Sequence, residues 1–247
     1  MPKKYKSLWR RLKATWKWFY VRRNIKSALA MAGIAGPLVL VICDITASIA
    51  AARAEGYNVI LDSISSLALT DLGFILTIGF MAIGLLVEIF VAGLLYSIKP
   101  AKWFHAGIGM LVFFGFALLL IGAFRTDPVD SPATIEGTIH GVMAMVAFWL
   151  FPLAVLALSR SIKSDPRWSG LYRYTMVTFV LALIMAILVA TIRDIIGWFG
   201  LLERLLVANM VIWVGVMAAR MLYLSVNPSA IPLRENPEFI IDENTEV

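Results

Sequence analysis

Six apolar blocks of about 20 residues each occupy most of this 247-residue sequence. A helix of about 20 apolar residues is long enough to cross the ~30 Å hydrocarbon core of a bilayer. A helix also satisfies its own backbone N–H and C=O groups, which find no partner in lipid. The pattern therefore predicts an all-α fold, a polytopic membrane bundle of six transmembrane helices. We expect these helices at residues 27–52, 73–97, 104–124, 139–159, 174–192 and 205–225.

The composition argues against a soluble protein and against a nucleic-acid-binding one. Hydrophobic residues make up 60% of the chain, compared with about 45–50% in soluble domains. The net charge is +6, but the positive charge is concentrated near the N-terminus and in alternate connections. That distribution is typical of membrane topology. We therefore expect membrane lipids as partners, and no nucleic acid.

The distribution of lysine and arginine predicts the orientation. Ten basic residues lie in residues 1–26, two in residues 98–103 and four in residues 160–173. The opposite connections contain far fewer, namely Arg53, Arg125, and Arg193 with Arg204. Basic residues accumulate in cytoplasmic connections. We therefore expect a multi-pass protein of the cell (plasma) membrane with both termini in the cytoplasm.

The two ends of the chain differ from its centre and suggest three regions. In residues 1–26 apolar and aromatic residues recur every three or four positions, with Lys and Arg between them. This pattern predicts a basic amphipathic interfacial helix that binds anionic lipid, with a docking helix for a partner protein as the alternative. Residues 27–225 form the predicted six-helix domain. Residues 226–247 are rich in acidic residues and are expected to be a flexible cytoplasmic tail.

Of the polar residues inside the apolar blocks, we single out Asp44, Glu88 and Asn209. An ionisable side chain in hydrocarbon is costly and usually faces protein or water. Asp44 and Glu88 could therefore handle a ligand or a proton, or each could be a protonated acid that hydrogen-bonds a neighbouring helix. We expect Asn209 to form a hydrogen bond between helices.

Polar residues also gather in the three connections predicted to face outward. We expect them to converge into a ligand-binding pocket, or alternatively to act as helix caps and ion pairs. In the second of these connections Ser131-Pro132 predicts a helix start, with serine as N-cap and proline at the first helical position. The predicted pocket residues are Tyr57, Asp62, Ser65, Arg125, Asp127, His140, Glu203 and Arg204.

Metal and cofactor motifs do not occur in the sequence. The only histidines, His105 and His140, are predicted near opposite ends of the membrane span, so they could not share a haem iron or a zinc ion. We find no glycine-rich phosphate loop, no HExxH and no G-x-S-x-G. We therefore expect neither a metal nor a cofactor.

Five groups of residues, taken in order, resemble a known membrane family. They are Gly33-Ile-Ala-Gly36-Pro37, Gly56-Tyr57 with Asp62-Ser-Ile-Ser65-Ser-Leu67, Gly122-Ala-Phe124-Arg-Thr-Asp127-Pro128, Gly137-Thr-Ile-His140-Gly141, and Gly200-Leu-Leu-Glu203-Arg204. Together they are similar to the domain-of-unknown-function 998 family, over roughly residues 28–225. The resemblance implies a six-helix membrane fold and no established activity. The Asp62–Ser65 stretch also faintly resembles the Frag1/DRAM/Sfk1 group, six-helix proteins associated with lipid organisation.

Three functions are compatible with these patterns. The first is a non-catalytic subunit that binds a lipid or another membrane-protein subunit through its outer polar residues. The second is a membrane-embedded hydrolase or transferase acting on a lipid, with His140 as base and Asp62 or Asp127 as acid or orienting group. In that alternative Arg125 or Arg204 would bind an anion. The third is a small transporter. We favour the first because the sequence offers no metal triad and no recognisable nucleophile–base motif.

Overall fold

The computed structural model describes the backbone of residues 3–192 and 197–227, and the side chains of residues 24–191 and 197–227. All regular elements in this part of the chain are helical. They are α1 (Lys3–Ala54), η1 (Ser65–Leu69), α2 (Gly73–Ser97), α3 (Phe104–Ala123), α4 (Ile135–Ser164), η2 (Ser169–Leu171), α5 (Tyr172–Ile192) and α6 (Phe199–Val226). Six of these helices are long and apolar enough to cross a membrane. The prediction of a six-helix, all-α membrane protein is confirmed.

The predicted helix boundaries hold for α2 but not for α4 and α6. Helix α4 begins at Ile135 with Thr134 as its N-cap, so the expected start at Ser131-Pro132 is wrong. Helix α6 begins at Phe199, six residues before the predicted position 205. Hydropathy locates the segment that crosses hydrocarbon, whereas a helix continues for as long as its end groups find partners. The start of α4 follows from its own N-cap, Thr134, and the start of α6 follows from backbone hydrogen bonds to the α1–α2 connection.

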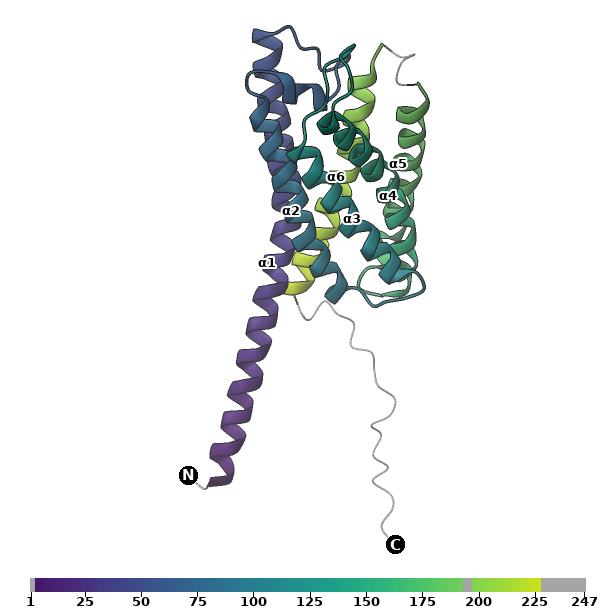
Figure 1. Cartoon of the computed structure of the whole chain (residues 1–247). Helices are drawn as coiled ribbons and strands as arrows, with labels where there is room; N and C mark the ends of the chain where they lie inside the picture. The colour runs from purple at the N-terminus through teal and green to yellow at the C-terminus, as the bar shows by residue number, and fades with distance from the viewer. Residues whose placement is uncertain (1–2, 193–196, 228–247) are drawn as a thin grey trace.

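Helix α1 joins two regions that the sequence suggested were separate. It runs without interruption from Lys3 to Ala54, and its first half continues past the bundle in line with the second half (Figure 1). No break in the helix marks the predicted boundary at residues 26 and 27. Placement of residues 1–26 on a membrane surface stays a prediction. Of the predicted acidic tail, residues 228–247 lie outside the described residues.

The helices form a closed ring in chain order. Each packs against the next, and α6 returns to pack against α1 (Figure 1). A hydrogen bond of 2.9 Å between the Ser27 and Ser225 hydroxyls joins α1 to the last turn of α6. We call the end of the bundle at which Ser27 and Ser225 lie the proximal end. It also contains the α2–α3 and α4–α5 connections. The opposite, distal end holds the α1–α2, α3–α4 and α5–α6 connections.

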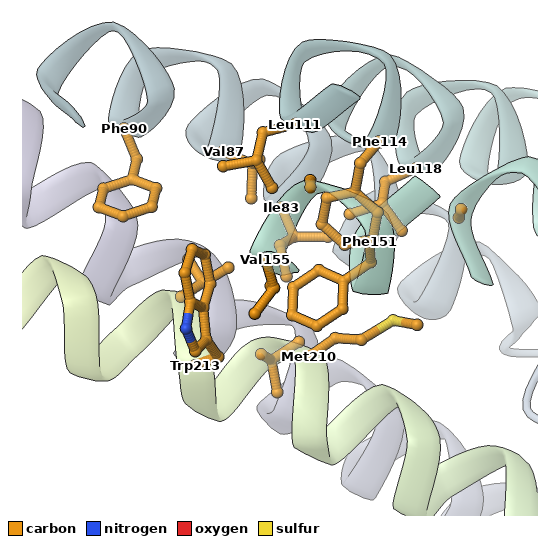
Figure 2. Close-up of a cluster of buried hydrophobic side chains, with 14 of the residues drawn as sticks. Ile83, Val87, Phe90, Leu111, Phe114, Leu118, Phe151, Val155, Met210 and Trp213 are labelled. Atoms are coloured by element: carbon orange, nitrogen blue, oxygen red, sulfur yellow. The ribbon is translucent and has the colours of Figure 1, made fainter. Parts of the chain in front are cut away.

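Aromatic side chains fill the centre of the ring. Phe151 of α4 lies between Phe114 of α3 and Trp213 of α6, with ring centroids 5.2 and 5.7 Å apart (Figure 2). Because lipid tails are as apolar as these side chains, close packing rather than hydrophobic transfer holds the helices together. Helices α2 and α3 approach closely at Gly84, where a Cβ atom would lie 2.7 Å from the backbone nitrogen of Leu119.

Candidate functional site

The α1–α2 connection caps the start of α6 at the distal end. The first N–H groups of a helix have no partner within the helix. Here the N–H of Gly200 donates to the carbonyl of Leu61 at 3.3 Å, and that of Leu201 donates to the carbonyl of Ile60 at 3.1 Å. A Cβ atom on Gly200 would lie 2.1 Å from the Asp62 carbonyl oxygen. Glycine at this position therefore allows the loop to reach the helix end.

Arg204, one turn further along α6, fastens the same loop. Its Nη1 donates to the carbonyls of Val59 at 2.9 Å and Asp62 at 3.1 Å. Its Nη2 donates to the hydroxyl of Tyr57 and lies 3.6 Å from Oδ1 of Asp44 in α1. The side chain of Arg204 is mostly buried. We call Asp44, Tyr57, Glu203 and Arg204 the distal cluster.

Tyr57 is held as a neutral phenol within this cluster. Burial raises its pKa to about 12, although the hydrogen bond from Arg204 opposes the shift. The protonated hydroxyl donates to the Ser63 carbonyl at 2.8 Å while it accepts from Arg204. Tyr57 therefore connects the arginine to the loop instead of acting as an acid or base at neutral pH.

Glu203 holds the next part of the connection. Its Oε2 accepts a 2.6 Å hydrogen bond from the backbone N–H of Ile64, which lies immediately before η1. The carboxylate is buried, and a charge-assisted bond of this kind is stronger than one between neutral groups. Ser65 follows, with its hydroxyl 3.1 Å from that of Ser63. The two adjacent residues of α6, Glu203 and Arg204, thus position the whole distal loop.

Two cavities lie beneath this loop. A deep cavity of about 30 Å³ has three polar residues in its wall, Ser65, His140 and Glu203. A side cavity of about 200 Å³ lies between α1 and α6 and has Asp44 and Arg204 in its wall. The rest of each wall is apolar or aromatic, and the two share five residues: Leu40, Ile64, Phe80, Val207 and Val211.

His140 caps the end of α3 from the first turns of α4. Its Nδ1 lies 2.9 Å from the Phe124 carbonyl and 3.2 Å from the Ile121 carbonyl. Carbonyl oxygens only accept hydrogen bonds, so Nδ1 carries the hydrogen, and Nε2 is the acceptor of the neutral ring. The ring is 5% exposed, and it faces the deep cavity.

Asp127 belongs to a separate helix cap. Its carboxylate accepts from the Thr134 hydroxyl at 2.7 Å and from the Thr134 N–H at 2.9 Å. These bonds hold the pKa of Asp127 below its ordinary value. The Thr134 oxygen in turn accepts from the N–H of Gly137, where α4 begins. Arg125 is exposed nearby.

The structure brings together only some of the predicted pocket residues. Tyr57, Arg204 and the Asp62 carbonyl meet in one set of hydrogen bonds, while Ser65, His140 and Glu203 line one cavity. The Asp62 carboxylate is turned to its own loop, where it accepts from the N–H of Asn58 at 2.7 Å. In the described part of the chain, no hydrogen bond or ion pair joins the carboxylate of Asp62 or Asp127 to His140.

The three predicted intramembrane polar residues have different surroundings. Asp44 joins the distal cluster through Arg204. The carboxyl group of Glu88 lies against Gly115 of α3, close enough that a Cβ atom there would be 2.6 Å from its Oε1. The Asn209 amide donates to the Thr178 carbonyl of α5 at 3.1 Å, a bond between helices as expected.

A second cluster, at the proximal end, was missed by sequence reasoning. The Asp165 carboxylate pairs with Arg167 at 2.6 Å and accepts from the N–H of Lys99 at 2.9 Å. Arg167 also donates to the Ser97 carbonyl, and Arg220 donates to the Arg167 carbonyl. We call Ser97, Asp165, Arg167 and Arg220 the proximal cluster. The arginines of this connection were interpreted only as topology signals, although Asp-Pro-Arg directly after a helix is a turn with a paired charge.

The site has no metal-binding arrangement within residues 24–191 and 197–227. No three His, Cys, Asp or Glu side chains there are grouped so that they could hold a metal ion. The polar groups of the distal end instead hold helix ends and a loop, around cavities that are mainly apolar.

Comparison with known proteins places the chain in a family. No curated protein and no solved structure matches it. A family model described as protein of unknown function (DUF998) matches residues 34–220, a range that includes the distal cluster and both cavities. Because the match covers well over half of the chain, the chain belongs to the DUF998 family, as its motifs predicted.

Proposed function

We propose that this protein is a non-catalytic membrane protein that binds an amphiphile, such as a membrane lipid, in the distal half of its bundle. The observation that carries the proposal is the side cavity of about 200 Å³ between α1 and α6. Along both helices its polar residues, Asp44 and Arg204, lie closer to the distal end than its apolar residues do. The side cavity adjoins the deep cavity, whose wall holds three polar residues, so the two together suit a molecule with an apolar chain and a polar head.

The position of the cavity supports a membrane ligand. Its wall includes Val41, whose side chain is 42% exposed on the outer surface of α1. The cavity therefore lies beside the surface that faces lipid in a membrane-spanning bundle. Apolar pockets with a few polar groups are the usual form of small-molecule sites. A lipid chain is the apolar molecule available at that surface.

The contacts favour binding over the hydrolase or transferase alternative. A catalytic base needs a group that orients it and a substrate within hydrogen-bond reach. The carboxylates of Asp62 and Asp127 are engaged by their own loops. Arg204, proposed in that alternative as an anion binder, already donates to several oxygens of the distal loop. The two carboxylates and the Arg204 guanidinium therefore already make hydrogen bonds that hold the loops in place.

Filling the side cavity tests the proposal. Ala208 lines it, and Ala208→Leu adds three carbon atoms to the space. Ala219, exposed three turns further along α6 and outside both cavities, is the matched control as Ala219→Leu. Native mass spectrometry from mild detergent should find a bound amphiphile in the unmodified protein and in Ala219→Leu, and little in Ala208→Leu. Equal retention by all three proteins would contradict the proposal.

We also propose that both termini face the cytoplasm, on the distribution of basic residues. Cysteines introduced at Lys102 and Ser164, both at the proximal end, should be shielded from an impermeant thiol reagent in intact cells, once Cys43 is replaced. A cysteine at Val129, which is 87% exposed in the distal α3–α4 connection, should react. Labelling at Ser164 from outside would reverse the orientation.

The basic residues of 1–26 support a further proposal, that this part of α1 binds anionic lipid. Each basic residue near an anionic surface contributes about 1 kcal/mol. A peptide of residues 1–26 should gain helical circular dichroism on anionic vesicles and much less on neutral ones. The same gain on both kinds of vesicle would favour docking to a protein.

A further inference from the structure

The two distal cavities lie next to each other and share part of their walls. Five residues line both of them, and Ile64 is one of these. The backbone of Ile64 is fixed by Glu203, while its side chain is almost fully buried between the cavities. A molecule in the side cavity is therefore separated from the deep cavity only by apolar side chains, which can change rotamer.

The size of the deep cavity limits which polar group could enter it. A cavity needs at least about 10–15 Å³ to hold one water molecule. At about 30 Å³, the deep cavity has room for a group the size of one or two waters. A hydroxyl group fits this space. The phosphate and alcohol of a phospholipid headgroup do not.

The charges around the cavities also favour a neutral polar group over a charged one. Arg204 is the one cation among the described residues of the two walls. The Arg204 guanidinium is paired with Asp44 and donates to loop carbonyls. An anionic headgroup would therefore have to compete with Asp44 for this one guanidinium, and the burial of a charge without a partner is costly.

His140 supplies a suitable partner for a hydroxyl. Because its Nδ1 donates to the α3 carbonyls, its Nε2 is an acceptor. Among the described residues, none makes a hydrogen bond to Nε2, and the ring lines the deep cavity. A hydroxyl that entered this cavity could donate to Nε2 without breaking a hydrogen bond of the protein.

We infer that the ligand is a neutral amphiphile with a hydroxyl headgroup, a long-chain or polycyclic alcohol, and that its hydroxyl donates to Nε2 of His140. Its apolar part lies in the side cavity, between α1 and α6. The inference rests on the proposed function, because it assigns the ligand class of the same site. It excludes phospholipids as the ligand of the cavities.

The test uses the full chain in lipid nanodiscs with three photoreactive probes: a long-chain alcohol, a phosphatidylglycerol and a phosphatidylcholine, each with a diazirine in its chain. The alcohol should label peptides around residues 205–213 of α6, and an excess of unreactive alcohol should suppress the labelling. The two phospholipids should label the outer surface without saturation. Labelling by the alcohol should disappear in Ala208→Leu and persist in Ala219→Leu.

A substitution at His140 separates the hydrogen bond from the fold. In His140→Asn the side-chain amide can take the place of Nδ1 and still donate to the α3 carbonyls, but the Nε2 acceptor is lost. Loss of one hydrogen bond should weaken alcohol binding about threefold to tenfold. The thermal midpoint of the protein without probe should stay close to that of the unmodified protein.

The possible results distinguish this inference from the proposed function. Saturable labelling by either phospholipid that is lost in Ala208→Leu would overturn the inference and leave the proposed function standing. Unchanged alcohol binding in His140→Asn would contradict the hydrogen bond assigned to Nε2 of His140. If no probe gave saturable labelling of α6, and Ala208→Leu behaved as the unmodified protein, both would be wrong.

Discussion

The distal and proximal ends of the bundle use similar chemistry in different surroundings. At each end an arginine pairs with an aspartate and donates to backbone carbonyl groups of a segment far away in the sequence. Arg204 does so with Asp44 at the distal end. Arg167 does so with Asp165 at the proximal end. An aspartate–arginine pair is therefore common to the two clusters.

The packing around the two clusters differs. At the proximal end Trp168, directly after Arg167, is 0% exposed and donates from its indole nitrogen to the Ser97 carbonyl. A large side chain therefore fills the space beside that cluster. At the distal end Arg204 borders the side cavity instead. The comparison teaches that a polar cluster near a helix end indicates a binding site only where the structure also leaves space for a ligand.

The largest effect on stability is expected at Asp165. Asp165→Ala removes a carboxylate that is 2% exposed and leaves Arg167 without its partner. Because Arg167 is 28% exposed, the cost should be at the lower end of the range for a buried pair, about 3 kcal/mol. A lower thermal midpoint in detergent would reveal it. Below that midpoint, retention of the bound amphiphile should be unchanged. If the amphiphile were lost as well, the two ends would not be functionally distinct.

The pH dependence of stability gives a second measurement on Asp165. Burial alone would raise its pKa, but Arg167 and the backbone N–H groups outweigh this and lower it. The folded pKa therefore lies below the unfolded one, so the stabilisation is present above the unfolded pKa. It is lost as the pH falls through the folded pKa. Asp165→Ala should flatten the fall in stability in that acidic range, whereas an unchanged slope would contradict the assignment.

Arg204→Gln should have the next largest effect, and it should change both stability and binding. The substitution leaves Asp44 without its cation and the Val59 and Asp62 carbonyls with weaker partners. We expect a loss of about 2–3 kcal/mol. We also expect loss of the amphiphile, because the wall of the side cavity moves. Tyr57→Phe, which removes only the phenol hydroxyl, is the milder control. If Arg204→Gln lowered the stability but still retained the amphiphile, the distal cluster would have only a structural role, as the proximal cluster has.

His140→Ala should have a smaller effect on the fold. It leaves the Ile121 and Phe124 carbonyls without the Nδ1 donor, at a cost of about 1–2 kcal/mol. His140→Asn should recover most of this loss, because its amide donates in the same place. Thermal unfolding of the two variants side by side measures the difference. If His140→Ala and His140→Asn were equally destabilised, the hydrogen bonds from Nδ1 to the α3 carbonyls would not be what His140 contributes to stability.

Asp127→Asn should have the smallest effect of the four. The carboxylate is at the surface, and Thr134 would still cap α4 through its bond from Gly137. We expect a slight fall in the thermal midpoint and full retention of the amphiphile. A loss of bound amphiphile in this variant would extend the site to the α3–α4 connection.

The sequence predicted the fold better than the site, for physical reasons. Hydrophobic length alone specifies a helix that crosses lipid, and α2 ends where its apolar block ends. The start of α4 was wrong because Ser131-Pro132 and Thr134 are both suitable caps. The Thr134 hydroxyl and N–H donate to the Asp127 carboxylate, and these bonds hold Thr134 at the cap position.

The contacts of the distal residues could not be predicted from the sequence for a related reason. Arg204 and Tyr57 contact each other, but Asp62 contributes its carbonyl oxygen to them, and residue type does not predict a backbone contact. Asp165 was overlooked because the basic residues around it are also those expected from membrane topology. The cavities depend on packing between helices, for which hydropathy gives no signal.

The most direct test of the account is an experimental structure of the protein extracted together with lipid from its own membrane. We predict continuous density for an apolar chain between Leu40 and Val41 of α1 and Val207 and Val211 of α6. The density should end in a small polar group within hydrogen-bond distance of Nε2 of His140. If instead α1 and α6 closed on each other and left no cavity, or if the space held only ordered water, the central claim of a ligand-binding bundle would be contradicted.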